Sequence, residues 1–330
     1  MEVIVTGSDF EKLLVYKDSI AVLIEDGILK AQSKIKGLET LVAFPIRRIS
    51  GDTDFFAITL SNEVKYFRGK ERDIHITTGE LTVIVSDGVV DMELPITRDV
   101  IADYRIPEYD HSKVFELTNI TGLRSMLITM NDISKSLLDY SGSYVTVKNG
   151  IATCINCSVL LECKTSLPDM RISTSSLFNA LALVSSAEKF ELLNEDKFML
   201  LISDAIIIRI VKEPLTESTT AQVIMDKYPN KTETKVTMPG MGEFLKSISQ
   251  LKGTSMVTLT YNENEVGVSL RGNGYSVNSR VQGTTLIINS DILTVLSKFL
   301  YSDEYTITRG DKHVCISTRN RKLVICATSF

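Results

Sequence analysis

The chain has 330 residues, of which 44% are hydrophobic and 23% are charged. This composition is typical of a globular protein and excludes wholesale disorder, collagen and coiled coils, and the length favours two or three domains. The net charge of −5 argues against a generally basic nucleic-acid-binding surface, but it is compatible with a local basic face.

Targeting signals and membrane spans are not evident in the sequence. No apolar run approaches the roughly 20 residues that a transmembrane helix needs, and the segment Met1–Val5 has no basic stretch typical of a signal peptide. Five cysteines, an odd number, without an export signal indicate a reducing compartment. We therefore expect a cytoplasmic protein that has no membrane partner.

Short helical segments recur along the chain, each preceded by one strand and followed by two or three strands. Their openings are separated by about 55 residues, which predicts the unit β-α-β-β-β repeated six times. The expected helices are 8–18, 61–72, 119–139, 174–189, 241–252 and 290–301.

Strands are predicted by alternating or β-branched runs between turn residues. The pairs Asp26-Gly27, Asp87-Gly88 and Asn149-Gly150 lie between such runs and predict hairpin turns. The clearest expected strands are 55–59, 73–77, 81–86, 89–95, 256–261, 265–271, 275–281, 285–288, 304–308, 313–318 and 321–328.

Two stretches without sustained periodicity, 98–112 and 213–235, are interpreted as linkers. They group the six units into three pairs and predict an α+β protein with three similar domains, at 1–105, 106–228 and 229–330. The alternative is an ordinary α+β chain in which the period has no architectural meaning.

The order and spacing of the units resemble the bacterial-type DNA sliding clamp, the β subunit of the replicative polymerase. The segment 102–107 (ADYRIP) looks like the segment that leaves the first clamp domain, and 226–231 (DKYPNK) looks like the crossover into the third. The strand 323–327 ends the chain as the family's terminal strand does, but without the usual Met-Pro-Met ending. Such divergence would suit a virus-encoded member.

The resemblance implies a specific assembly. Two three-domain subunits would close head to tail into a homodimeric ring, with sheets outside and helices lining a hole for double-stranded DNA. Such a ring would act as a processivity factor without sequence-specific DNA contacts, and it would tether the DNA polymerase. The resemblance also implies a clamp loader as a partner.

A DNA-lining role predicts that the helices are more basic than the rest of the chain. The six expected helices together carry a charge of +2, against −7 for the remainder, which has the sign that sequence-independent phosphate binding requires. In the second helix, three basic residues share one face at helical spacing. The candidate DNA-binding residues are Lys65, Arg68, Arg72 and Lys70, followed by Lys12, Lys17, Arg124, Lys135, Lys246, Lys252 and Lys298. For each of them, an ordinary solvated helix face is the competing interpretation.

The resemblance also implies a hydrophobic pocket between the second and third domains, where partner peptides dock. Matching by position places Leu161, Pro229, Val324 and Cys326 in this pocket. Strand alternation puts residues 324 and 326 on the same side. For each of these residues, an ordinary core position is the competing interpretation and the more common one.

Motifs for catalysis or metal binding are not evident. Cys154 and Cys157 form a C-x-x-C pair, but neither a second pair nor paired histidines complete a zinc site. The three histidines lie in unrelated units, and no dinucleotide or Walker fingerprint occurs. We therefore expect no metal, no cofactor and no enzymatic activity.

Three functional hypotheses follow from these features of the sequence. The first is a non-enzymatic sliding clamp, and the second is a non-catalytic, repetitive β-rich scaffold or viral assembly protein that does not encircle DNA. The third is a hydrolase whose site has no sequence signature. Retention on circular but not on linear DNA would distinguish the clamp from the scaffold.

Overall fold

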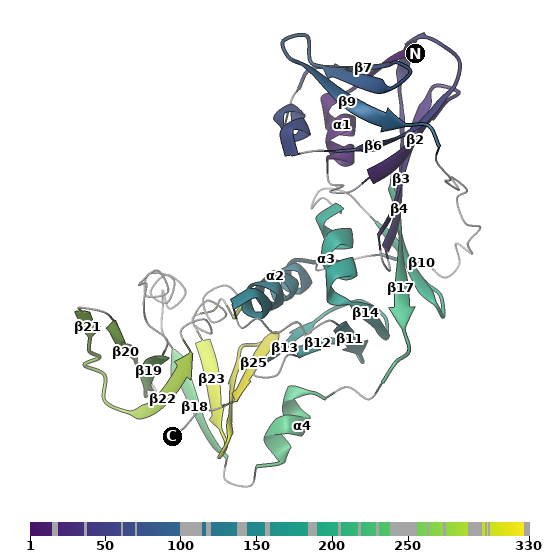
Figure 1. Ribbon diagram of the computed structural model, residues 1–330. Helices are drawn as coiled ribbons and strands as arrows, with labels where there is room; N and C mark the ends of the chain where they lie inside the picture. The colour runs from purple at the N-terminus through teal and green to yellow at the C-terminus, as the bar shows by residue number, and fades with distance from the viewer. Residues whose placement is uncertain are drawn as a thin grey trace. The chain divides into compact units, whose positions relative to one another are not determined.

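The computed structural model describes most of the chain as strands and short helices, an α+β fold (Figure 1). The described residues are 1–14, 19–35, 38–60, 62–69, 71–99, 114–116, 120–136, 144–155, 159–183, 190–203, 206–216, 219–228, 231–237, 256–262, 264–272, 275–289, 299–300, 302 and 304–326. Contacts divide the chain into two compact units, unit 1 (1–117 and 179–212) and unit 2 (118–178 and 213–330). Residues 106–228, which the sequence groups as one domain, therefore contribute to both units.

The secondary-structure elements follow the expected order closely. The helices are α1 (Gly7–Leu13), the 3-10 helix η1 (Asn62–Phe67), α2 (Ile120–Ser136), α3 (Thr174–Leu183) and α4 (Ala221–Asp226). The strands of unit 1 are β1 (Glu2–Val5), β2 (Ser19–Glu25), β3 (Ile28–Ile35), β4 (Leu38–Pro45), β5 (Arg47–Ser50), β6 (Asp54–Thr59), β7 (Ile74–Thr78), β8 (Thr82–Ser86), β9 (Asp91–Thr97), β10 (Val114–Glu116), β15 (Glu191–Asn194), β16 (Phe198–Ile202) and β17 (Ile206–Glu213). Those of unit 2 are β11 (Tyr144–Lys148), β12 (Ile151–Ile155), β13 (Val159–Lys164), β14 (Met170–Ser173), β18 (Thr232–Thr237), β19 (Met256–Tyr261), β20 (Val266–Gly272), β21 (Tyr275–Val277), β22 (Thr284–Asn289), β23 (Glu304–Arg309), β24 (His313–Ser317) and β25 (Arg321–Cys326).

Neighbouring repeats exchange their first strands. In unit 1, β1 pairs with β7 and β6 pairs with β2, so that each first strand joins the sheet of the other repeat. The third and fourth repeats do the same through β10 with β15 and β14 with β11, and the fifth and sixth through β18 with β23 and β22 with β19. The exchange therefore occurs three times along the chain, always within a consecutive pair of repeats.

Two further antiparallel pairings join strands that are far apart in the sequence. In unit 1, β4 pairs with β17, with Val42 opposite Ile206. In unit 2, β13 pairs with β25, with Leu160 opposite Val324. Each of these four strands is the fourth strand of its repeat, so the sheets continue from one pair of repeats into the next by the same rule.

Two of the three expected hairpin turns have the backbone conformation of tight two-residue turns. Asp26 and Gly27 have φ angles of 49° and 75°, and Asn149 and Gly150 have 52° and 73°. Positive φ at both central residues is the geometry of the tight turn that matches strand twist. Gly88, in the third expected turn, has a φ of 80°.

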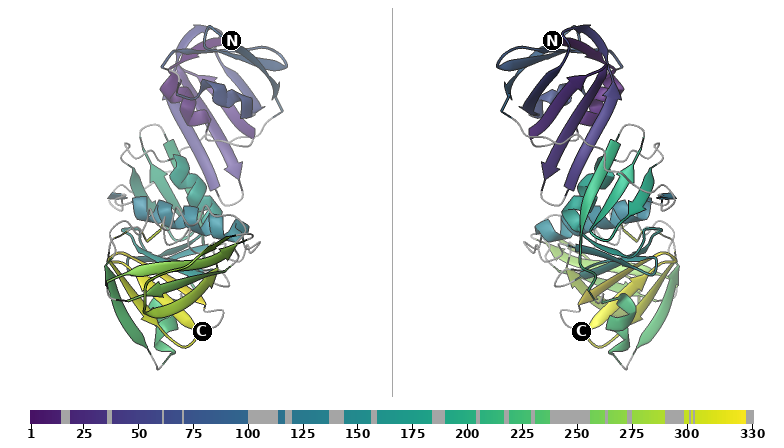
Figure 2. Two further views of the ribbon diagram at one scale, coloured as in Figure 1. Left: turned by 90° about the vertical axis from the view of Figure 1, so that its left-hand side faces the viewer. Right: turned by 90° about the vertical axis from the view of Figure 1, so that its right-hand side faces the viewer.

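The helices of unit 1 pack through aromatic side chains. Thr6 caps α1 by accepting a hydrogen bond from the Asp9 backbone N–H at 3.1 Å. Phe10 of α1 and Phe67 of η1 are both buried and meet edge to face, with ring centroids 5.8 Å apart. Figure 2 shows the strands of the N-terminal part, in purple, curving around these two helices.

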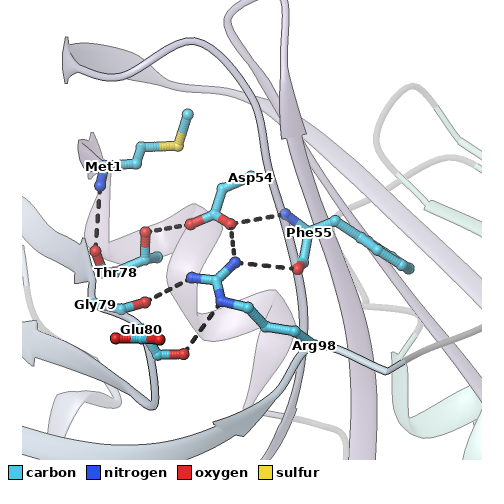
Figure 3. A network of polar contacts seen from close by, with 7 residues as sticks. All are labelled: Met1, Asp54, Phe55, Thr78, Gly79, Glu80 and Arg98. Carbon is cyan, nitrogen blue, oxygen red and sulfur yellow. Dashed lines mark hydrogen bonds and ion pairs between the residues drawn. The ribbon is translucent and has the colours of Figure 1, made fainter.

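A polar network holds the end of β9 against β6 and the β7–β8 turn (Figure 3). The guanidinium of Arg98 donates to Asp54 Oδ1 and to the backbone carbonyls of Gly79, Glu80 and Phe55. Thr78 Oγ1 donates to the other oxygen of Asp54. Partial burial alone would raise the pKa of Asp54, but the hydrogen bonds from Arg98 and Thr78 and the Arg98 charge outweigh it and lower the pKa below its usual 3.8.

Two predictions about secondary structure are wrong. The second helix is a 3-10 helix that ends at Phe67 instead of an α-helix over 61–72, and Gly69, with a φ of 67°, turns the chain directly after it. The expected linker 213–235 holds α4 and the beginning of β18. The expected helix 241–252 and all of the helix 290–301 except Phe299 and Leu300 lie outside the described residues. Among the helices that are described, none is long and apolar enough to cross a membrane.

Candidate DNA-facing and partner-binding sites

The basic residues of α1 and η1 lie beside acidic neighbours. Lys12 pairs with Asp9 at 3.0 Å within α1, and Arg68, directly after η1, pairs with Glu11 at 3.1 Å. Lys65 donates to the Asn62 side chain at 2.7 Å. The Arg68–Glu11 pair is exposed and contributes little stability, whereas the Lys12–Asp9 pair is partly buried.

The common face expected for Lys65, Arg68 and Arg72 is not formed by one helix. Lys65 and Arg68 are three residues apart, which a 3-10 helix places one above the other, whereas Arg72 lies beyond the end of η1 and is exposed. In the part of the chain that the structure describes, no carboxylate pairs with Lys65 or Arg72. Lys65 and Arg72 are therefore exposed basic side chains that no carboxylate among the described residues neutralises.

Only some of the other candidate DNA-binding residues lie among the residues that the structure describes. Arg124 is half-buried on α2, whose buried face is formed by Leu123, Met126, Leu127 and Met130. Lys135 lies in the last turn of α2, but its side chain is outside the described set, as are Lys17, Lys70, Lys246, Lys252 and Lys298 entirely. The predicted DNA-facing set thus stays a prediction for these residues.

Two of the residues predicted for the partner-peptide pocket, Leu161 and Val324, do not share a face of the sheet. In the antiparallel pair β13–β25, Leu160 is opposite Val324, and Leu161 is opposite Leu323. Since directly opposed residues share a face and consecutive residues alternate, Leu161 and Val324 lie on opposite faces of the sheet. Leu160 is the neighbour of Val324. Pro229 and the Cys326 side chain lie outside the described residues.

Helix α4 covers the face that carries Leu160 and Val324. These two residues and Cys315 of β24 form a buried apolar cluster with Ala221 and Met225 of α4, and Ile224 packs against it. Sequence reasoning missed this helix because it is only six residues long. The signals present were Thr220, whose side chain caps the helix through the Val223 N–H at 3.2 Å, and the i, i+4 spacing of Ala221 and Met225.

A buried carboxylate lies beneath the beginning of α4. Glu162 is 4% exposed, and its Oε1 accepts a hydrogen bond from the Ala221 backbone N–H at 2.6 Å. Burial raises the pKa of Glu162 above its usual 4.5, although the Ala221 N–H and the charge of Lys322, its cross-strand neighbour, act in the opposite direction. In the sequence, Glu162 lies within the otherwise apolar run 159–163, so the sequence alone did not single it out.

Three cysteines are buried free thiols. Cys154, Cys163 and Cys315 are each less than a tenth exposed, and burial raises the pKa of Cys154 and Cys315 to about 11 and that of Cys163 to about 12. Thiols with such pKa values are poor nucleophiles at neutral pH. Within the described ranges, no group of three or more His, Cys, Asp or Glu side chains is placed to hold a metal ion.

Comparison with known proteins shows the fold. No protein-family model and no curated protein sequence matches the chain. Solved structures do match over its whole length. The DNA polymerase III β subunit from Thermotoga maritima has a TM-score of 0.73 at 12% identity, with 100% of this chain and 99% of that chain covered. The β subunit from the DNA polymerase of Streptococcus pyogenes has a TM-score of 0.70 at 14% identity. The Helicobacter pylori β clamp bound to a DNA ligase peptide has a TM-score of 0.66 at 12% identity. The last two matches cover 100% of both chains. The chain therefore has the fold of the bacterial DNA polymerase III β sliding clamp.

Proposed function

We propose that this protein is a sliding clamp: a non-catalytic, homodimeric ring that encircles double-stranded DNA without sequence preference and tethers a DNA polymerase. The observation that carries the proposal is the match to bacterial β clamps over the full length of both chains. Since a fold can serve many functions, the proposal also depends on features of this chain. A clamp loader and a cytoplasmic location belong to the same proposal.

The strand exchanges support an organisation in three clamp-type domains, close to 1–105, 106–228 and 229–330. Each domain would consist of two repeats that exchange their first strands, as β1 and β6 do with β7 and β2. The two-unit division by contacts is compatible with three domains because the fourth and sixth repeats continue the sheets of the first and third through β17 and β25.

The same pairing rule leaves two strands for ring closure. Fourth strands of repeats pair as β4 with β17 and β13 with β25, which leaves β9 of the second repeat and β21 of the fifth. In the part of the chain described, β9 pairs over Asp91–Pro95 only with β8, and β21 pairs only with β20. Open strand edges are templates for pairing with another chain. A head-to-tail β9–β21 contact between two copies would close the ring.

Charge supports this closure. Asp91 and Glu93 are exposed on β9, whereas Arg280 is exposed three residues after the end of β21. Opposite charges across an interface steer association and fix the register. The edge also contains Pro95, which has no N–H to offer and is tolerated because it lies on an edge strand.

Charge reversal at this edge tests the ring. The wild-type protein is expected to have a mass in solution of twice 36.7 kDa. The double variant Asp91→Lys/Glu93→Lys is expected to raise the Kd of self-association by about tenfold or more, because like charges then face Arg280. Sedimentation equilibrium measures this change.

Two further variants complete this test. Asp196→Lys, in the exposed turn between β15 and β16, is the matched control and should leave the mass unchanged. Adding Arg280→Glu to the double variant should restore association. A monomeric wild-type protein, or equal association of all variants, would contradict closure through this edge.

The proposed contacts of Lys65 and Arg72 with DNA predict a change in the salt dependence of DNA affinity. Replacing Lys65 and Arg72 by alanine removes two exposed cations that have no carboxylate partner among the described residues. The slope of log K for DNA against log salt should become shallower by up to about 1.8, since each phosphate contact contributes roughly 0.9. Fluorescence anisotropy with duplex DNA measures the slope. Lys34→Ala on β3 is the control, and an unchanged slope in the double variant would remove this face from the proposed DNA contacts.

The partner-binding proposal assigns peptide docking to the face of β13, β24 and β25 that α4 covers. The Helicobacter pylori clamp structure contains a DNA ligase peptide, and for this chain we propose that segments of the polymerase and the clamp loader bind at the cluster of Leu160, Cys315 and Val324. Leu160 replaces Leu161 in this proposed site.

A further inference from the structure

Glu162 is placed where a charge is costly and where α4 is attached. Its side chain points to the same face of β13 as Leu160, because the two residues are two positions apart on a strand. This face is apolar and covered by α4. A leucine or valine at position 162 would extend the cluster without such a cost, so the carboxylate is the feature that requires an explanation.

The contacts of Glu162 are few. The Ala221 N–H is the hydrogen bond the structure shows for the buried carboxyl group, at 2.6 Å. From β25, Lys322 faces it as its cross-strand neighbour, and from β24 the neutral thiol of Cys315 lies within electrostatic range, as does Cys163 on β13 itself. On the other side, β12 presents Thr153, and α4 carries Asp226 and Lys227 only at its far end. The charge is thus incompletely compensated.

We propose that Glu162 is a protonation-dependent anchor of α4, which holds the helix closely over the apolar cluster when the carboxyl is neutral and loosens it when the carboxyl is ionised. The inference rests on the proposed function for its biological meaning, since the loosened helix would uncover the cluster where partner peptides are proposed to bind.

The direction in which docking of α4 changes with pH follows from the linkage between docking and protonation of Glu162. Glu162 is 4% exposed and α4 covers its face of the sheet, so lifting α4 would admit water to the carboxyl and make its ionised form less costly. Burial, which is the larger influence on the pKa of Glu162, therefore couples its protonation to docking of the helix. The docked state therefore binds the proton more tightly. Docking is strongest below the ordinary glutamate pKa of 4.5 and weakens as the pH rises through the docked pKa. Above the docked pKa the anchor is ionised and the helix is loosened.

Hydrogen–deuterium exchange on the full-length protein without DNA or partners tests the proposal. Protection of the segment 219–228, corrected for intrinsic exchange, should fall in the wild type between about pH 4 and pH 8, by up to about tenfold for each pKa unit of coupling. Glu162→Gln keeps an acceptor for the Ala221 N–H without the charge, so its protection should be higher at pH 8 and independent of pH. The segment 7–13 of α1 is the internal control, since it should behave alike in both proteins.

A second variant and a second probe keep the test decisive. Lys322→Met leaves Glu162 in place but removes its nearest cation, so the ionised carboxyl is compensated less well while α4 is docked. The loss of protection should therefore become larger and extend to higher pH than in the wild type. Cys315 lies under α4, so its alkylation by iodoacetamide, followed by mass spectrometry, should be slower in Glu162→Gln than in the wild type at the same pH.

Two results would overturn the proposal. One is wild-type protection that does not change with pH, and the other is lower protection in Glu162→Gln than in the wild type at pH 8, which would make the carboxylate a stabilising cap. Because these measurements use the protein alone, they do not depend on whether it encircles DNA. If the protein were not retained on circular DNA but the protection of α4 still depended on pH, the proposed clamp function would be wrong and the proposed role of Glu162 would stand.

Discussion

Replacing Leu161 by alanine is expected to lower the free energy of unfolding by about 2–5 kcal/mol, the range for a fully buried leucine. Leu161 is completely buried on the face of β13 opposite Leu160. Cys163, on the same face as Leu161, contacts Met126 of α2 at 3.7 Å between the sulfur atoms, so this face packs on α2. Leu161 is therefore a core residue in this structure. Urea denaturation measures the change.

The matched variant Leu160→Ala distinguishes a role in the core from a role beneath α4, at the proposed docking site. It should cost a similar free energy of unfolding, but it should also reduce the protection of α4 in hydrogen exchange, because Leu160 is part of the cluster beneath that helix. Leu161→Ala should leave α4 protection largely unchanged. If Leu161→Ala were instead the variant that loosened α4, the assignment of the two faces would be wrong.

Arg98→Ala is expected to lower the free energy of unfolding by about 2–3 kcal/mol at neutral pH, because it leaves the mostly buried Asp54 carboxylate without its cation and frees three backbone carbonyls. The control is Arg48→Ala, whose ion pair with the fully exposed Asp52 should contribute less than about 0.5 kcal/mol.

The loss of unfolding free energy caused by Arg98→Ala should depend on pH in a defined direction. The pKa of Asp54 is lowered in the folded protein, so its contribution to stability is present above the ordinary value of 3.8 and is lost as the pH falls through the folded pKa. The difference between wild type and Arg98→Ala should therefore shrink in acid. A constant difference from neutral pH to below pH 3 would show that the carboxylate is not the partner that matters.

The repeat and most strand positions could be predicted from the sequence because period-two patterns and turn residues are local signals. The expected strands 256–261 and 304–308 correspond to β19 and β23, and the Asp26-Gly27 and Asn149-Gly150 turns have the expected conformation. Strand exchange was not predictable in this way. Pairing of β1 with β7 joins residues about 70 positions apart, which no local pattern encodes.

The candidate sites were less predictable for two physical reasons. Matching by position does not fix the face of a strand on which a side chain lies, and neighbouring residues such as Leu160 and Leu161 lie on opposite faces. Helical spacing assumed 3.6 residues per turn, whereas η1 is a 3-10 helix that ends before Arg72. Glu162 and α4 became visible only when the strands that surround them were placed together.

Retention on DNA of defined topology tests the clamp account most directly. The protein, loaded on nicked circular duplex by the proposed clamp loader, is passed over a gel-filtration column before and after a single restriction cut. A ring that encircles DNA stays with the circle in salt that disrupts ordinary phosphate contacts, and it leaves the DNA after linearisation. Equal retention on circular and linear DNA, or none on either, would contradict the account.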